Sequence, residues 1–285
     1  AGASAPRGGL RRARPPPARG LGGRRGPPHL PRVQASADPA DLGTADVVFL
    51  TVKMYDVDTA ATQLRPLLGP GTLVVTLQNG VEATDMVARR VGREHVAGGV
   101  AYVAAVIAEP GLIRHTALDA LIVGELDGAM SPRPPALRDA ASAAGFTFTA
   151  SEDIRVDLWS KFVRLSVFSS MTAATRSPLG VLRAQPALFA LVEAAVDEAF
   201  AVGRAHGVAL GPRVRDEVFA MYRGMPPQAK SSMLEDLERG RRLELPWLGG
   251  AVVRLGRDAG VPTPVHETIE KLLLPFVPGG LPESV

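Results

Sequence analysis

One lysine stands inside an otherwise apolar stretch near the middle of the chain. Lys161 lies between Trp159 and Phe162, in a run from Asp157 to Leu165 that has the composition of a largely buried helix. A lysine in this setting either extends its ammonium to solvent at the helix edge or lines a cleft where its proton is used. In the first case Asp157, at the i−4 position, is the expected partner. In the second, Lys161 is a candidate for chemistry.

Two more polar residues follow apolar runs of strand length. Lys53 closes the run 47–52, and Asn79 follows the run 73–77 within the sequence Gln-Asn-Gly. In open parallel sheets, ligands bind beyond the carboxyl ends of the strands. Each residue also has an ordinary structural interpretation, because lysines at strand ends are often solvated and Asn-Gly is a common turn dipeptide. Together, Lys53 and Asn79 would place an ammonium and an amide at the same edge of the sheet, beyond the carboxyl ends of its strands.

The second half of the chain supplies a serine and a glutamate. Ser232 and Glu235 match the S-x-x-E capping box, which is a sufficient structural reason for that serine. Glu244 suits the first turn of a following helix, where the helix dipole favours a carboxylate. His115 is interpreted as a hairpin residue rather than a catalyst. The five histidines show no metal-binding spacing and cysteine is absent, so we expect neither a metal site nor thiolate chemistry.

The elements that must position these residues fall into two groups. Strands are expected at 47–52, 73–77, 98–107, 112–115, 121–123 and 146–149, and helices at 58–68, 82–91 and 136–144. Unbroken apolar strands alternating with helices are typical of a mostly parallel sheet covered on both faces. Only helical patterns follow, at 156–174, 186–206, 212–222, 232–239, 244–259 and 266–274. We therefore expect an α/β sheet domain over 33–150 and an all-helical domain over 151–285.

The basic charge of the chain is concentrated at its start. Residues 1–32 hold eight arginines and no acidic residue, with many prolines and glycines, and this composition predicts a disordered tail. Of 32 Lys and Arg, 24 then remain against 29 Asp and Glu, a net charge of −5. An acidic body argues against nucleic acid as a partner. No apolar run reaches the roughly 18 residues of a membrane span, and the lack of cysteine suits a cytoplasmic protein.

A series of short motifs resembles the ketopantoate reductase (2-dehydropantoate 2-reductase) family. The motifs are TVK and LQNG after successive strands, then GLIRHT, LWSKF, SSMLEDLERGRRLEL and GVPTP, and the resemblance runs from about His29 to Phe276. It implies an incomplete Rossmann-like domain that binds a dinucleotide, a helical domain, and an active site between them. It also implies NADPH-dependent reduction of 2-dehydropantoate, or a similar 2-keto acid, to the 2-hydroxy acid in pantothenate biosynthesis. A homodimer is compatible with it.

The resemblance also implies a role for each candidate residue. Lys161 would be the general acid, because an ammonium can stabilise the negative charge that hydride transfer builds on the keto oxygen and then deliver a proton. Glu244 would bind the substrate hydroxyl, and Ser232 the substrate carboxylate. Lys53 and Asn79 would lie around the nicotinamide ribose and the substrate. None of these roles requires a metal.

Side chains of the expected substrate pocket depart from the family pattern. Leu165 and Ser169 stand where many members have asparagine, and Leu248-Gly-Gly stands where many have Leu-Asn-Gly. Amides that bind a hydroxyl discriminate strongly against compounds lacking it. A pocket with fewer amides is therefore expected to accept a more apolar keto acid.

The start of the chain departs further. Family members open with a strand and a G-x-G-x-x-G turn that binds the pyrophosphate, whereas neither Gly8-Gly9 nor Gly22-Gly23 follows a strand or opens a helix. The run 47–52 is consequently expected to lie at an unpaired sheet edge. An alternative to the reductase therefore stays open. It is a non-catalytic relative, or a truncated inactive protein, that binds a metabolite or a partner.

Overall fold

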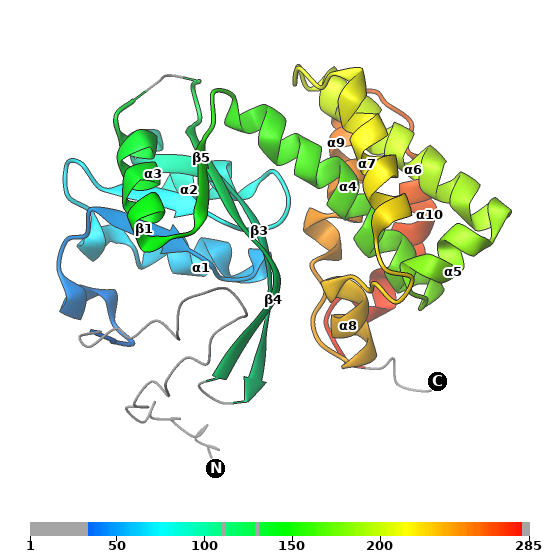
Figure 1. Ribbon diagram of the computed structural model, residues 1–285, viewed down its shortest axis with the longest axis horizontal. Helices are drawn as coiled ribbons and strands as arrows, with labels where there is room; N and C mark the ends of the chain where they lie inside the picture. The colour runs from blue at the N-terminus through cyan, green and yellow to red at the C-terminus, as the bar shows by residue number, and fades with distance from the viewer. Residues whose placement is uncertain (1–33, 110–111, 129–130, 281–285) are drawn as a thin grey trace, which may run out of the picture.

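The protein consists of a sheet domain and a helical domain. The computed structural model describes residues 34–109, 112–128 and 131–280, so the tail predicted for 1–32 lies outside the described residues. Figure 1 shows the sheet and its helices on the left and the helical bundle on the right. This arrangement confirms the predicted fold class. Among the described residues, no helix has the length and apolarity needed to cross a bilayer.

Five strands form one sheet in the order β1-β2-β3-β4-β5. The strands are β1 (Val47–Leu50), β2 (Leu73–Thr76), β3 (Val96–Glu109), β4 (Leu112–Glu125) and β5 (Thr147–Ala150). All neighbours are parallel except β3 and β4, which form a long antiparallel hairpin. Within the described part of the chain, β1 pairs only with β2 and forms a sheet edge, as predicted.

The hairpin corrects one prediction. The two strands expected at 112–115 and 121–123 are a single strand, because pairing with β3 continues across the segment between them. Leu118, with φ of 62°, is the extra residue of a bulge where the register shifts between Val103 and Ala104. A bulge of this kind accommodates one residue without ending the ladder.

Helices cover both faces of the sheet. α1 (Val57–Thr62) and α2 (Ala83–Val91) share a core with Val74, and α3 (Arg133–Ala144) shares another with Val75. Successive side chains of a strand point to opposite faces, so the burial of both valines requires both layers. This explains why the strands of this domain are apolar without alternation.

Prolines account for two differences from the predicted helices. The helix expected over 58–68 ends at Thr62, because Pro66 lies in a separate 3-10 turn. The helix expected over 244–259 begins only at Gly249, because Pro246 lies in another such turn. Proline lacks the backbone N–H that a continuing helix would need.

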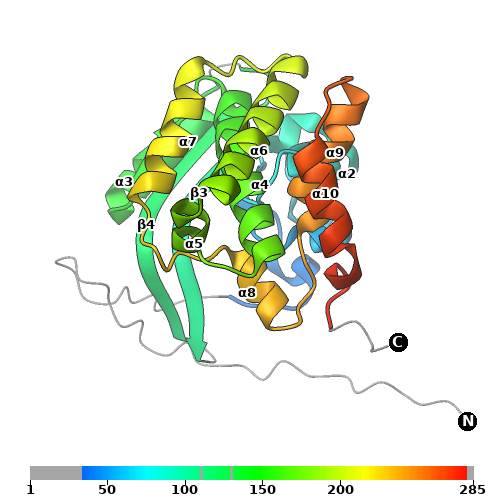
Figure 2. The same cartoon turned by 90° about the vertical axis from the view of Figure 1, so that its right-hand side faces the viewer.

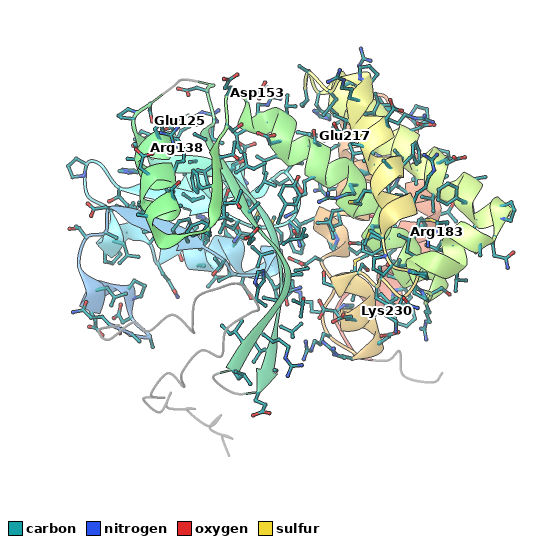
Figure 3. All side chains as sticks on the ribbon, in the orientation of Figure 1. Glu125, Arg138, Asp153, Arg183, Glu217 and Lys230 are labelled. Atoms are coloured by element: carbon teal, nitrogen blue, oxygen red, sulfur yellow. The ribbon has the colours of Figure 1, made fainter. Side chains whose placement is uncertain are left out.

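The helical domain is built around one apolar core that includes Phe162, Tyr222 and Val252. Its helices are α4 (Ile154–Thr175), α5 (Leu179–Ala184), α6 (Pro186–Ala205), α7 (Pro212–Gly224), α8 (Ser232–Glu238), α9 (Gly249–Asp258) and α10 (Pro264–Leu273). α4 starts beside the sheet and runs into the bundle, as Figures 1 and 2 show. Asp153, labelled in Figure 3, caps α4 by accepting hydrogen bonds from the backbone N–H groups of its first turn.

The loop after β2 approaches the helical domain at a glycine. Gly80 has φ of 98°, and a Cβ atom added there would lie 2.8 Å from the backbone oxygen of Trp247. The indole of Trp247 in turn lies 6.5 Å from the ring of Tyr55, which follows β1. The close approach of the two domains at this point therefore requires glycine for its backbone conformation and for its size.

We expect Gly80→Ala to lower the free energy of unfolding by about 2–4 kcal/mol, because it combines left-handed strain with a clash against backbone. Two alanine variants separate these causes. Gly43 also has a positive φ (69°) but open space around it, so Gly43→Ala should show only the strain, about 1–3 kcal/mol. Gly71→Ala has open space at an ordinary φ and should cost nothing. Urea unfolding followed by circular dichroism measures all three, and equal losses for Gly80→Ala and Gly43→Ala would contradict the contact.

Candidate active site

A cluster of three charged side chains joins the two domains. The Lys53 ammonium lies 3.0 Å from Oδ2 of Asp236 on α8 and 3.1 Å from Oε2 of Glu244. The second oxygen of Glu244 accepts a hydrogen bond from the backbone N–H of Met54 at 3.0 Å. Glu244 is 5% exposed, so it is not the surface glutamate of the ordinary interpretation. The end of β1 is thereby fixed to the helical domain.

The charges in this cluster act on Lys53. Burial alone would lower the pKa of its ammonium, but the charge of Glu244 and the hydrogen bonds to both carboxylates outweigh that effect. The pKa of Lys53 therefore lies above its ordinary value, and the side chain stays charged at neutral pH. Asp236 was not among the predicted residues. The sequence did contain a hint, because Asp236 stands among the apolar residues Met233 and Leu237, which are buried in α8.

The next strand end is held by Gln78. Its amide nitrogen donates to the backbone oxygens of Leu50 and Val52 at 2.8 and 3.1 Å, which fixes the chain just before Lys53. Asn79 follows as a partly buried residue beside Gly80, the glycine at the domain contact. Parallel pairing of β1 and β2 places the ends that carry Lys53 and Asn79 next to each other, as the sequence predicted.

Lys161 lies on α4 and points to the sheet domain. Its ammonium donates a hydrogen bond of 2.8 Å to the backbone oxygen of Ala101 on β3. Asp157 is not its partner, because that carboxylate instead accepts a hydrogen bond from the hydroxyl of Ser151. The interpretation of Lys161 as a solvated lysine paired with Asp157 is therefore wrong. The lysine is partly buried in the contact between the domains.

The surroundings of Lys161 change its acidity. Burial first, and the positive charge of Arg164 second, lower the pKa of the ammonium to about 8, although the charge of Glu244 opposes them. Arg164 and Tyr102 were not predicted from the sequence. The guanidinium lies 5.0 Å from the centre of the Tyr102 ring, and the Lys161 ammonium lies 5.8 Å from it. An ammonium with a pKa near neutrality can both donate a proton and regain one.

The predicted role of Ser232 as a helix cap is wrong by one residue. Ser231 precedes α8, and its hydroxyl accepts a hydrogen bond of 3.0 Å from the N–H of Leu234. That hydroxyl also bonds to Thr172 on α4 at 2.7 Å, which fixes α8 to the central helix. Ser232 is the first residue of α8 and is exposed. The structure does not bring it into contact with the other candidates, so its substrate role stays a prediction.

A groove of about 590 Å³ begins at the carboxyl ends of the parallel strands. It is lined by Thr51 after β1, Leu77 after β2 and Ala101 on β3, and it continues along one face of the hairpin past His115. The backbone oxygen of Ala101 accepts the hydrogen bond from Lys161, but the lysine side chain itself does not line this groove. His115 itself bonds to the backbone of Leu118, as expected of a hairpin residue.

These groups can bind an anion or polarise a carbonyl, and one of them can exchange a proton. Among residues 34–109, 112–128 and 131–280 there is no cluster of three or more His, Asp or Glu side chains that could hold a metal ion. Three features are unusual. Lys161 is desolvated, the buried carboxylate of Glu244 pairs with Lys53, and a groove begins at the strand ends. The combination is typical of an active site between two domains.

Comparison with known proteins gives the family. The family described as "Ketopantoate reductase PanE/ApbA" matches residues 20–128, and "Ketopantoate reductase PanE/ApbA C terminal" matches residues 153–275. The chain is 34% identical over 261 residues to a 2-dehydropantoate 2-reductase of Mesorhizobium japonicum, covering 85% of this chain and 79% of the relative. It is 31% identical over 242 residues to the enzyme of that name from Archaeoglobus fulgidus, with the same two coverages.

A solved structure agrees with the sequence comparisons. The PanE/ApbA family ketopantoate reductase from Ralstonia eutropha JMP134 superposes with a TM-score of 0.79 at 33% identity, covering 86% of this chain and 80% of that one. The similarity to these enzymes therefore extends over both the sheet domain and the helical domain of this chain. The chain belongs to the ketopantoate reductase family of oxidoreductases.

Proposed function

We propose that the protein uses NADPH to reduce a 2-keto acid, 2-dehydropantoate or a close analogue, to the 2-hydroxy acid. The observation that carries this proposal is the Lys161 ammonium, which binds the backbone of β3 in the contact between the domains and has its pKa lowered to about 8. Family membership supports the reaction class, and the relatives named 2-dehydropantoate 2-reductase support the substrate class.

The cofactor would supply the hydride. The groove suits the nicotinamide end of a dinucleotide, because it lies beyond the carboxyl ends of parallel strands and is lined largely by apolar side chains such as Leu77 and Val103. Lys53 and Asn79, on the adjoining rim, would then lie near the ribose. This fit makes NADPH the proposed cofactor for the chain.

Lys161 is assigned the proton transfer. Its N–H groups would donate to the keto oxygen, and charge that builds there during reduction is stabilised by the ammonium in a partly desolvated site. The proton then passes from Nζ to the alkoxide, and the neutral amine regains a proton from solvent. Burial and Arg164 favour loss of this proton, whereas the charge of Glu244 keeps the lysine protonated beforehand.

Glu244 is assigned to substrate binding. A carboxylate offers about four lone-pair sites, and the structure uses two of them, for Met54 and Lys53. The remaining sites would accept a hydrogen bond from a substrate hydroxyl. Ser232 would bind the substrate carboxylate from the start of α8.

The pocket composition bears on substrate choice. Leu165 is partly buried, and the hydroxyl of Ser169 is fully buried without a partner among the described residues. Neither supplies an amide to a substrate hydroxyl. We propose that apolar 2-keto acids compete better here than in relatives with asparagine at these positions, which a panel of 2-keto acids in an NADPH oxidation assay would test. Saturable NADPH oxidation with any of them would also reject a non-catalytic relative.

Lys161→Ala should lower kcat by roughly two to four orders of magnitude, because it removes the positioned acid. NADPH binding, measured by isothermal titration, should change little. Lys271→Ala is the matched control, since that lysine is exposed on α10 and pairs only with Glu267 among the described residues. A Lys161→Ala enzyme with near-normal kcat would remove the lysine from the mechanism.

The pH dependence should report the same lysine. The acid form is required, so kcat/KM should stay constant below pH 8 and fall about tenfold per pH unit above the pKa of about 8. An unshifted lysine would hold the plateau to beyond pH 10. Steady-state rates from pH 6 to 10 decide between them, and the residual rate of Lys161→Ala should lack the break.

Glu244→Gln should raise KM for the keto acid by about tenfold or more with a smaller change in kcat, because a charge-assisted hydrogen bond to the substrate is lost. The amide keeps the size of the side chain, but its single oxygen can replace only one of the two that accept from Lys53 and Met54, so the melting temperature of the variant is measured beside KM. Glu235→Gln, at an exposed ion pair on α8, is the control. An unchanged KM in Glu244→Gln would exclude the assigned role.

A further inference from the structure

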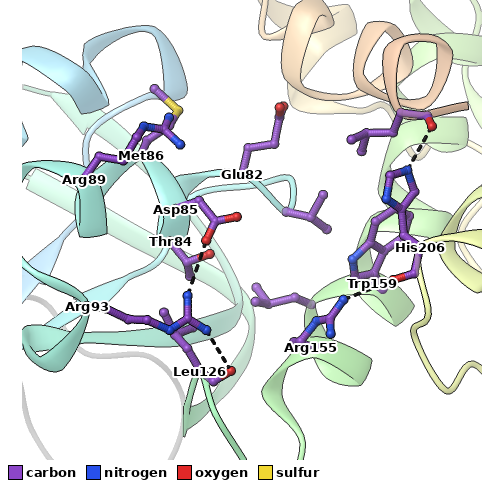
Figure 4. Close-up of a pocket in the computed structure, with 13 residues that line it drawn as sticks. Glu82, Thr84, Asp85, Met86, Arg89, Arg93, Leu126, Arg155, Trp159 and His206 are labelled. Carbon is purple, nitrogen blue, oxygen red and sulfur yellow. Dashed lines mark hydrogen bonds and ion pairs between the residues drawn. The ribbon is translucent and has the colours of Figure 1, made fainter. Parts of the chain in front are cut away.

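A second cavity, of about 570 Å³, opens between the two domains on the side of α2. Figure 4 shows its walls, with α2 and the segment after it on one side and the first turns of α4 with His206 on the other. None of Lys53, Asn79, Lys161 or Glu244 lines it. With about 100° of rotation per helical residue, Lys161 points to a different side of α4 from Arg155 and Trp159. The cavity is therefore distinct from the candidate active site.

Arginines stand on both walls of this cavity. Arg89 and Arg93 come from the sheet domain, and Arg155 comes from the helical domain. Arg93 donates to the backbone oxygen of Leu126 at 3.3 Å, and Arg155 donates to that of His206 at 3.2 Å. These carbonyl oxygens orient the guanidinium groups but do not neutralise them. Several N–H donors of each group remain for a ligand.

The acidic side chains at the cavity leave an excess of positive charge. Glu82 is paired with Arg254 of α9 at 2.6 Å, an ion pair that joins the two domains beside the cavity. Asp85 lies 3.8 Å from Arg93 and is largely exposed. Within the described residues, Arg89 and Arg155 form no ion pair. The cavity and its rim thus hold four arginines against two carboxylates.

Most of the remaining lining residues are apolar, and two rings among them are held in place. Trp159 is 7% exposed and stacks on His206, with 5.9 Å between ring centres and 25° between planes. The Nε2 atom of His206 lies 2.9 Å from the backbone oxygen of Leu255, which holds the ring. Leu126 and Leu158 complete this surface. An apolar body of ring size would find a preformed wall here.

We propose that this cavity binds a small organic anion, a phosphate or carboxylate carried on an apolar body. Guanidinium groups recognise both anions through paired N–H donors, and the volume lies within the usual range of ligand pockets. Because its arginines belong to different domains, a ligand contacting both sets would bridge the two walls of the cavity. The proposal does not depend on the proposed reaction.

Tryptophan fluorescence tests the proposal. The chain has two tryptophans, so Trp247→Phe leaves Trp159, at the cavity wall, as the sole indole. The full chain is titrated with phenyl phosphate, benzoate and inorganic phosphate. Saturable changes with phenyl phosphate or benzoate are expected, and the tighter of the two identifies the preferred anion. Inorganic phosphate should bind more weakly, and equal affinity for it would contradict a role of the apolar wall.

Arginine variants locate the binding. Arg93→Gln and Arg155→Gln should each raise Kd about tenfold or more, because each loses a charge-assisted hydrogen bond. Arg138→Gln, on an exposed pair with Asp139, and Lys161→Ala, in the active site, should leave Kd unchanged. Circular dichroism and melting temperature confirm that each variant is folded. No saturable change in fluorescence, unchanged Kd in both cavity variants, or loss of binding in Lys161→Ala would overturn the proposal.

Discussion

The contact of Lys53 with Asp236 and Glu244 is the interaction on which the geometry between the domains depends. Both carboxylates are largely buried, and buried charges are costly unless they are paired and hydrogen-bonded. Lys53 pairs with both, and the N–H of Met54 satisfies the second oxygen of Glu244. Loss of the lysine would leave Asp236 with only the more distant Arg241, at 3.7 Å, and Glu244 without an ion pair among the described residues. The end of β1 and the start of the segment after α8 therefore have one favourable arrangement.

The same arrangement sets the acidity of Lys161. Its ammonium meets the sheet domain through the backbone of Ala101, in a place where burial and Arg164 destabilise its charged form. Glu244, held by the Lys53 cluster, acts in the opposite direction. The balance leaves a pKa near 8, which is suitable for an acid that must give and regain a proton near neutral pH. The carboxylate of Glu244 therefore both holds the two domains together and affects the pKa of Lys161.

α4 connects both parts of the interdomain surface. It carries Lys161 toward the hairpin and carries Arg155 and Trp159 toward the cavity beside α2. Its first turn is capped by Asp153 and packs on the sheet through Ile154, so the helix is fixed at the point where the domains meet. A change in the angle between the domains would alter both sites together. This coupling follows from one rigid helix rather than from a chain of side-chain contacts.

The sequence by itself determined the fold class and pointed to Lys53, Lys161 and Glu244, which the structure places in the contact between the domains. Apolar runs without alternation require a sheet covered on both faces, and Val74 and Val75 are buried on opposite sides of β2. Lys53 and Asn79 were candidates because each follows a strand, and Lys161 was a candidate because it lies in an otherwise apolar helix.

Local patterns failed where the partners are distant in the chain. The expected pair of Lys161 and Asp157 does not form, and Ser231 rather than Ser232 caps α8. Only the tertiary structure decided that Asp236 and Glu244 face Lys53, more than 180 residues away, and that arginines of two domains line one cavity. Hydrophobic period and capping residues act over a few positions, whereas burial and pKa depend on groups that only the packing of the two domains brings together.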